Sequence, residues 1–178
     1  MGNRDAGKQI RSDWEEYRNL AEACREEMFS VCYAVLNRPA EAHEIVCRTV
    51  ADMYASHTVF PPKTNPADVL CREAYRRARE FREKNRHTQP VLPTVAAGGG
   101  DVVSNDKKTF IIHIEQDVKL ALTILPDDQR EAVLLRDACG FSYERIEFIT
   151  GASAGMVRSR VGLARTGIKN ILMKKWDV

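Results

Sequence analysis

The side chains best suited to chemistry in this sequence are arginines near its end. Arg158, Arg160 and Arg165 lie close together, and Ala154 and Gly155 before them are too small to obstruct a helix N-terminus. A planar guanidinium can pair with the O6 and N7 atoms of guanine, and the N–H groups of a helix N-terminus can hold a phosphate. This spacing indicates contact with DNA, although an ordinary helical hairpin with a basic exterior would carry the same residues.

The elements that must position these arginines have the outline of a helix-turn-helix. Ser142 is a suitable N-cap for a short helix through Ile149, and Gly151 offers a turn into a last helix that reaches about Lys175. Three-to-four spacing predicts that the last helix packs through Val157, Val161, Ala164, Ile168 and Ile171. Upstream, the sequence predicts helices over 114–125, stopped by a proline, and over 127–139, stopped by a glycine.

The first part of the chain is also expected to be helical. A Ser-x-x-Glu capping box at Ser12 predicts the start of a long amphipathic helix that Pro39 breaks, and a second helix follows. The stretch from His57 to Pro66 has three prolines and predicts a loop. Asn65 then offers an N-cap for a third helix, 67–86, with proline at its first helical position.

Between these parts, residues 87–109 contain two prolines, three successive glycines and no helical apolar period, which predicts a linker. We therefore expect an all-α fold of two small helical domains joined by a flexible linker. The expected division is a tail at 1–11, a first domain at 12–86, a linker at 87–110 and a second domain at 111–178.

Charge is segregated along the chain although the net charge is only +2. Residues 13–54 have nine acids and four bases (−5), residues 69–87 seven bases and three acids (+4), residues 101–152 six bases and ten acids (−4), and residues 153–178 six bases and one acid (+5). Two separate basic helices suggest two contacts with a polyanion. Two solvated helix faces would explain the charge equally well.

Other functional classes find little support. The 178 residues hold no nucleotide-binding, nucleophile-elbow or zinc-protease motif, so we expect no enzyme and no cofactor. The five cysteines form no C-x-x-C pair and match no ligand spacing, so we expect buried thiols rather than a metal site or disulfides. No stretch suits a membrane span or a signal peptide, and we expect a cytoplasmic protein.

Three linked blocks in the C-terminal part carry a resemblance to a known family. They are Leu125 to Arg136 (LPDDQREAVLLR), Gly140 to Ile146 (GFSYERI) and Gly155 to Val161 (GMVRSRV), followed by Ala164-Arg165. In this order they strongly resemble region four of extracytoplasmic-function (ECF) sigma factors. Pro39 to Cys47 (PAEAHEIVC) more loosely resembles a helix of region two of the same family.

The resemblance implies a stress-response transcription initiation factor that binds core RNA polymerase and promoter DNA, under the control of an anti-sigma factor. Region two would bind the clamp helices of the largest polymerase subunit through Glu41, Glu44, Ile45, Val46 and Arg48. It would read and melt the minus-ten element with the loop from His57 to Asn65 and with Arg72, Tyr75, Arg76 and Arg79. Region four would meet the flap of the second subunit and read the minus-thirty-five element with Ala154, Gly155, Arg158, Ser159, Arg160 and Arg165.

The chain departs from the family pattern in both regions. Val69 stands where the family usually has Trp, Arg76 where Asn is common, and Met156 where the recognition helix usually begins with Thr. Two alternatives stay open: a sigma-like decoy that binds an anti-sigma factor, and a conventional helix-turn-helix regulator that dimerises through its first half. Decoys normally carry a receiver domain after the sigma-like part, and this sequence ends at Val178, a few residues after the last expected helix.

Overall fold

Helices make up the fold. The computed structural model describes residues 3–56, 60–61, 63–85 and 107–175, with side chains from residue 14 in the first range and from residue 116 in the last. These ranges contain helices and turns but no strand, so the expected all-α fold is confirmed. The predicted linker, 87–110, lies outside the described residues except for its last four positions, which are helical.

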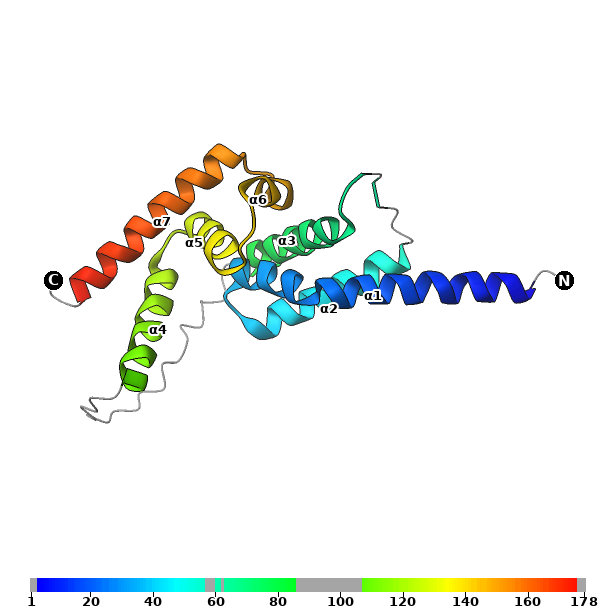
Figure 1. Ribbon diagram of the computed structural model, residues 1–178, viewed down its shortest axis with the longest axis horizontal. Helices are drawn as coiled ribbons and strands as arrows, with labels where there is room; N and C mark the ends of the chain where they lie inside the picture. Colours follow the sequence, from blue (N-terminus) through cyan, green and yellow to red (C-terminus); the bar gives the residue numbers. More distant parts are fainter. Residues whose placement is uncertain (1–2, 57–59, 62, 86–106, 176–178) are drawn as a thin grey trace.

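The described residues of the N-terminal half form three helices (Figure 1). They are α1 (Asn3–Leu36), α2 (Pro39–Ala55) and α3 (Pro66–Lys84), and each packs against the other two. Asn37 ends α1 in a left-handed conformation with a φ of 52°, which Asn tolerates better than most residues. The side chain of Asn65 accepts a hydrogen bond from the Ala67 N–H at 3.0 Å, as the predicted N-cap of α3.

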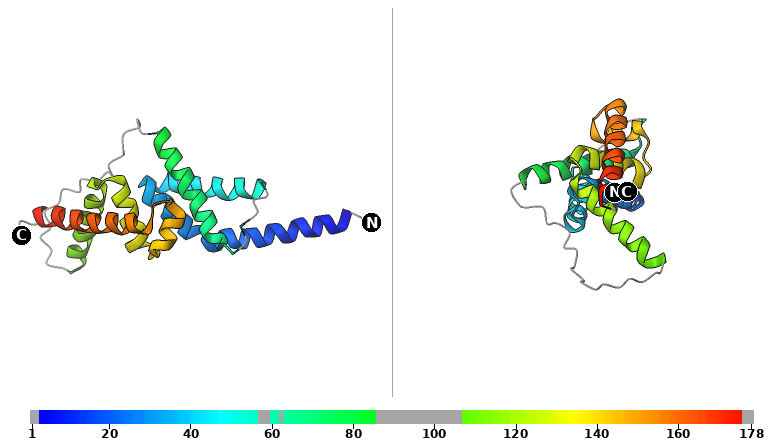
Figure 2. Two further views of the ribbon diagram at one scale, coloured as in Figure 1. Left: turned by 90° about the horizontal axis from the view of Figure 1, so that it is seen from above. Right: turned by 90° about the vertical axis from the view of Figure 1, so that its left-hand side faces the viewer.

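The first helix is longer than the sequence pattern predicted. It begins at Asn3 rather than at Ser12, so residues 3–11, the expected tail, are helical and the capping box lies inside the helix. The added turns contain no proline and several good helix formers, so nothing in them stops the helix. In Figures 1 and 2 this end of α1 projects beyond the other helices.

The described residues of the C-terminal half form four α-helices and a π-helical turn. They are α4 (Lys107–Ile124), α5 (Asp127–Val133), the π-turn η1 (Leu134–Ala138), α6 (Tyr143–Thr150) and α7 (Ala154–Lys175). The caps of α6 follow the prediction: the Ser142 hydroxyl accepts from the Arg145 N–H at 3.1 Å, and Gly151 is left-handed with a φ of 76°.

Two predictions about this half were wrong in detail. The helix expected from residue 114 begins at Lys107, because no proline or glycine interrupts the preceding turns. The single helix expected over 127–139 changes to a π-turn at Leu134. There the Cys139 N–H donates to the Leu134 carbonyl at 3.0 Å, five residues back, and the extra residue turns Phe141 into the core.

One hydrophobic core joins the two halves. It is built on buried side chains from α1 and α3, such as Met28 and Leu70, and from the C-terminal half, such as Leu135, Ile146 and Ile149. Helix α3 packs on α6, and α1 contacts both α5 and η1. The two halves therefore lie directly against each other, and Figure 1 shows α6 beside α3.

Candidate nucleic-acid interface

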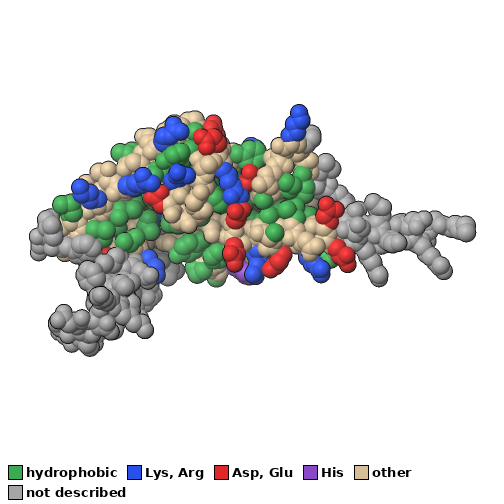
Figure 3. Space-filling model, viewed as in Figure 1, with side chains coloured by type: hydrophobic (Ala, Val, Ile, Leu, Met, Phe, Trp, Pro, Cys, Tyr) green, Lys and Arg blue, Asp and Glu red, His purple; other side chains and the backbone are tan. Residues whose placement is uncertain are grey.

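Helix α7 presents the predicted DNA-reading face to solvent. Val157, Val161 and Ala164 are buried, which fixes the rotation of the helix. Gly155, Arg158, Ser159 and Arg165 are consequently exposed, and Ala154 and Arg160 are half-buried. Figure 3 shows basic side chains along this side of the C-terminal half. The structure therefore exposes Gly155, Arg158, Ser159 and Arg165 on α7, whereas Ala154 and Arg160 lie half-buried beside the buried stripe.

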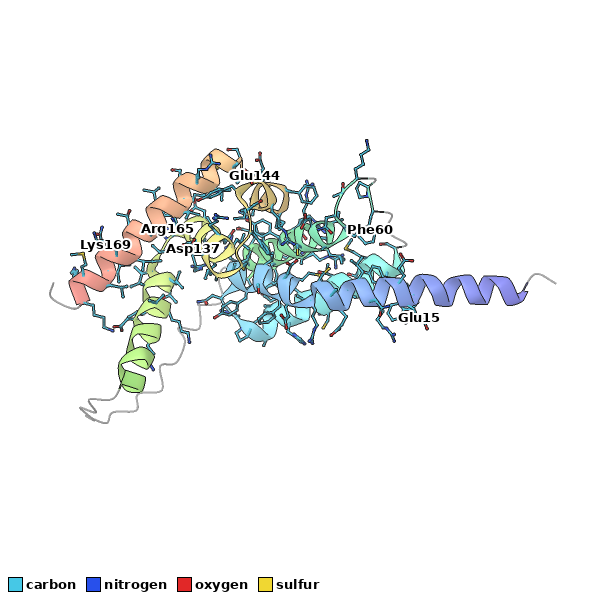
Figure 4. All side chains as sticks on the ribbon, in the orientation of Figure 1. Glu15, Phe60, Asp137, Glu144, Arg165 and Lys169 are labelled. Atoms are coloured by element: carbon cyan, nitrogen blue, oxygen red, sulfur yellow. The ribbon has the colours of Figure 1, made fainter. Side chains whose placement is uncertain are left out.

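Two of the α7 arginines are bound by carboxylates of the same half. Arg165 makes a bidentate pair with Asp137 of η1, with N–O distances of 2.6 and 2.9 Å, and the two lie side by side in Figure 4. Hydrogen bonding to Arg165 lowers the pKa of Asp137 below its ordinary value. Arg160 pairs with Asp128 of α5 at 3.1 Å.

Arg158 has an aromatic partner instead. Its guanidinium lies 4.8 Å from the centre of the Tyr143 ring, which also stacks with Arg136 at 4.7 Å. A guanidinium on a ring face keeps its N–H edge available for other acceptors. Of the three arginines, Arg158 is thus the one whose donors need least rearrangement to reach a base or a phosphate.

The N-terminus of α7 is already occupied by a carboxylate. The Ala154 N–H donates to Oε2 of Glu147 at 3.2 Å, and the Ser153 hydroxyl accepts from the Met156 N–H at 3.3 Å. The sequence predicted that these N–H groups could approach a phosphate. In this arrangement Glu147 takes that position, so a phosphate would have to displace it.

Helix α3 carries a second basic surface. Arg72, Arg76 and Arg79 are exposed and line one side of a hollow of about 610 Å³. Arg76 is paired with Glu80 and, at 2.6 Å, with Glu73. Hydrogen bonding to Arg76, and next to the neighbouring Arg77, lowers the pKa of Glu73 to about 2.

Two other predicted minus-ten residues have different places. Tyr75 is 6% exposed, and its hydroxyl donates to Glu131 of α5 at 2.7 Å. Burial, followed by the nearby Glu131 charge, raises the pKa of the Tyr75 hydroxyl. Tyr75 therefore does not face solvent with the α3 arginines. Asn65 caps α3 next to the expected loop, whose residues 57–59 and 62 lie outside the described residues.

Comparison with known proteins decides the family. Residues 115–166 match the family model for sigma-70 region 4. The ECF RNA polymerase sigma factor EcfG of Rhodopseudomonas palustris (strain TIE-1) is 31% identical over 135 residues, covering 74% of this chain and 71% of that protein. This chain belongs to the ECF RNA polymerase sigma factors.

Two further relatives agree with this assignment. The ECF sigma-E factor of Escherichia coli (strain K12) is 42% identical over 69 residues, which cover 38% of this chain and 36% of that protein. The sigma factor RpoE of Bartonella quintana, solved in complex with the anti-sigma factor NepR, superposes with a TM-score of 0.61 at 26% identity. That match covers 91% of this chain and 97% of RpoE, so it includes both halves of this sigma factor.

The residues expected to contact polymerase divide into two groups on α2. Glu44 and Arg48 are exposed and paired with each other at 2.6 Å, and half-buried Glu41 pairs with Arg38 at 3.3 Å. Ile45 and Val46 lie in the hydrophobic core at 6% and 3% exposure. In this sigma factor those two residues therefore hold α2 against its neighbours, and the charged residues form the accessible surface.

Sequence reasoning missed the residues that connect the two halves. Arg145 of α6 pairs with Glu27 of α1 and Asp68 of α3, and Glu131 receives both Tyr75 and Arg82. For Glu131 and Arg82 the alternating charge of the chain was a signal, because an acidic segment there pairs with a basic one. The charge pattern predicted contact with a polyanion or solvated helix faces, and not contacts between the two halves.

The cysteines behave as expected in part. Cys24, Cys32 and Cys71 are buried, Cys139 is half-buried and Cys47 is exposed, and all are free thiols. Burial raises the pKa of the Cys32 thiol to about 12. Among the described residues, no group of histidine, cysteine and carboxylate side chains is arranged to hold a metal ion. No described helix is both long and apolar enough to cross a bilayer.

Proposed function

We propose that the two halves of this sigma factor read two promoter elements for core RNA polymerase. Residues 111–178 would read the minus-thirty-five element through α7, and residues 12–86 would read the minus-ten element through α3 and the loop before it. The observation that carries the proposal is the exposed face of α7, where Gly155, Arg158 and Ser159 lie within the part matched by the region 4 family model. We assign the chain no catalytic centre of its own.

The proposed polymerase surface is the exposed side of α2. Glu44 and Arg48, with half-buried Glu41, would contact the clamp helices of the largest subunit. Ile45 and Val46 would hold α2 in place through their contacts with the core. The C-terminal half would meet the flap of the second subunit. Because polymerase acts in the cytoplasm, the proposal places the chain there.

We also propose control by an anti-sigma factor. The similarity to Bartonella quintana RpoE extends over 91% of this chain, and that protein was solved bound to the anti-sigma factor NepR. A partner that spans both halves could keep the chain from polymerase. A decoy that binds the anti-sigma factor without polymerase is the competing function, and binding to core polymerase separates the two.

The test is a DNA selection with purified chain and sigma-free bacterial core polymerase. Polymerase-bound fragments are recovered from a random double-stranded library and sequenced, with core polymerase alone as the control. We expect two enriched elements at one fixed spacing, one for each half. A palindromic element bound without polymerase would favour a conventional helix-turn-helix dimer, and absence of binding to core polymerase would favour the decoy.

A further inference from the structure

Two large apolar side chains are exposed on the proposed DNA-reading helix. Met156 is 50% exposed and Leu163 is 56% exposed. The buried side of α7 fixes the rotation of the helix, so at about 3.6 residues per turn Met156 and Leu163 lie together on the side that faces away from the core. Ser159 is exposed between them on the same side. This side of α7 thus has a partly apolar stripe, about two helical turns long, that the described residues leave open to solvent.

Arginines lie on both sides of this stripe. The same helical spacing puts Arg158 and Arg165 along one side of it and Arg160 along the other. Arg160 and Arg165 also pair with Asp128 and Asp137, which DNA phosphates would have to displace. A helix in the major groove of DNA meets base edges with its outward side and phosphates at its two flanks. An apolar stripe between cationic side chains therefore fits the floor and the walls of that groove.

The floor of the major groove presents one large apolar group, the C5 methyl of thymine. The other groups there are hydrogen-bond donors and acceptors, which a leucine side chain cannot satisfy and a thioether satisfies weakly. Contact between an apolar side chain and a thymine methyl removes both from water, which favours binding. Only the side chain of Met156 is available for such a contact, because its backbone N–H already donates to the Ser153 hydroxyl at 3.3 Å.

We infer that Met156 and Leu163 read thymine methyl groups in the minus-thirty-five element. The inference rests on the proposed function, because it needs α7 in the major groove of promoter DNA. The two residues are seven positions apart, which is about 10 Å along the helix axis or about three base pairs of DNA. The element therefore has two sensitive thymines at about that separation, on either strand. Met156 stands where the family usually has Thr, so this contact is a departure of the chain from the family pattern.

Replacement of thymine by deoxyuridine tests the contact, because it removes the C5 methyl and leaves the base pair intact. The probe is the double-stranded DNA enriched in the selection with core polymerase, and its thymines are replaced one at a time. Fluorescence anisotropy at fixed salt gives the Kd of the polymerase complex for each probe. For the wild type we expect the Kd to rise about threefold at each of two thymines of one element.

Two variants assign each methyl group to its side chain. Met156→Ala should lose the response to deoxyuridine at one of the two positions and keep it at the other, and Leu163→Ala should show the reverse. Met173→Ala is the control, because Met173 is 39% exposed on the same helix but about 25 Å further along its axis. That variant should respond like the wild type. Circular dichroism of all three variants should match the wild type, because the replaced side chains are exposed.

The outcomes separate this inference from the proposed function. If the polymerase complex binds DNA but deoxyuridine affects the wild type, Met156→Ala and Leu163→Ala equally, the inference is overturned and the proposed function stands. If the chain binds DNA only without polymerase, the proposed function fails, and the same probes are measured with the chain alone. Responses lost in the two variants would then still support methyl reading. If the chain binds no DNA in either form, both the proposed function and the inference fail.

Discussion

Arg165 and Asp137 form a bidentate ion pair between α7 and η1, so an arginine of the proposed DNA-reading face is held by a carboxylate of its own half. Both side chains of the pair are exposed to solvent. If α7 reads promoter DNA as proposed, its phosphates must compete with Asp137 for this guanidinium. The Asp137 charge would then lie beside the bound DNA and oppose binding.

Asp137→Asn should strengthen promoter binding. The substitution removes the competing charge and leaves Arg165 available to a phosphate, so we expect the Kd of the polymerase complex for promoter DNA to fall by about threefold. Fluorescence anisotropy at fixed salt measures it. Glu22→Gln removes the same charge from a pair with Arg25 on α1 and should leave the Kd unchanged. Weaker binding by Asp137→Asn would show that the ion pair positions Arg165 for DNA.

Removing two arginines from α7 should separate DNA binding from polymerase binding. For the double variant Arg158→Ala, Arg165→Ala we expect promoter affinity about tenfold or more below wild type and a shallower salt dependence, because two cationic contacts are lost. The affinity of this variant for core polymerase should equal that of the wild type. The control is the double variant Arg18→Ala, Arg25→Ala, which removes the same amount of charge from α1. Equal loss of both affinities in the α7 variant would indicate damage to the fold.

Glu44→Lys should impair association with core polymerase. Glu44 is exposed on α2 and pairs with Arg48, so the reversed charge changes the surface while the core is left intact. We expect an affinity for core polymerase about tenfold lower, measured by titrating labelled chain. Glu22→Lys, the same change on the exposed side of α1, is the control. Unchanged association of Glu44→Lys would remove this surface from the polymerase interface.

Glu73 should make stability depend on acid pH. Its pKa is about 2 in the folded chain, below the ordinary value of 4.5, mainly because Arg76 donates to it. A depressed pKa means that the stabilisation is complete above about pH 4.5 and is lost as pH falls toward 2. Glu73→Gln should therefore cost about 1 kcal/mol at pH 7 and less at pH 3.5 in urea unfolding. An equal cost at both pH values would show that the ion pairs of Glu73 are not the cause.

Local chemistry explains which parts of the fold were predictable. Asn65, Ser142 and Gly151 act within a few residues of their own position, so the helix ends that they set could be predicted from sequence. The apolar stripe of α7 likewise fixed which arginines face solvent. The π-turn at Leu134 was missed because its residues also suit an ordinary α-helix, and the packing that selects the π form involves distant residues.

Long-range contacts explain the rest. Tyr75 was expected to read the minus-ten element with the α3 arginines, yet its hydroxyl is bound by Glu131, which comes 56 residues later. Arg145 and Glu27 are 118 residues apart. Nothing in the spacing of the sequence pairs such residues, because only the packing of the two halves on each other brings them together. The alternation of acidic and basic segments indicated that oppositely charged residues could pair, but not which residues do so.

Run-off transcription tests the central claim most directly. Purified chain is added to sigma-free bacterial core polymerase with genomic fragments of the source organism as templates, and core polymerase alone is the control. If the chain acts as a sigma factor, we expect discrete new transcripts whose start sites share upstream elements at one spacing. The absence of both new transcripts and stable binding to core polymerase would contradict that account.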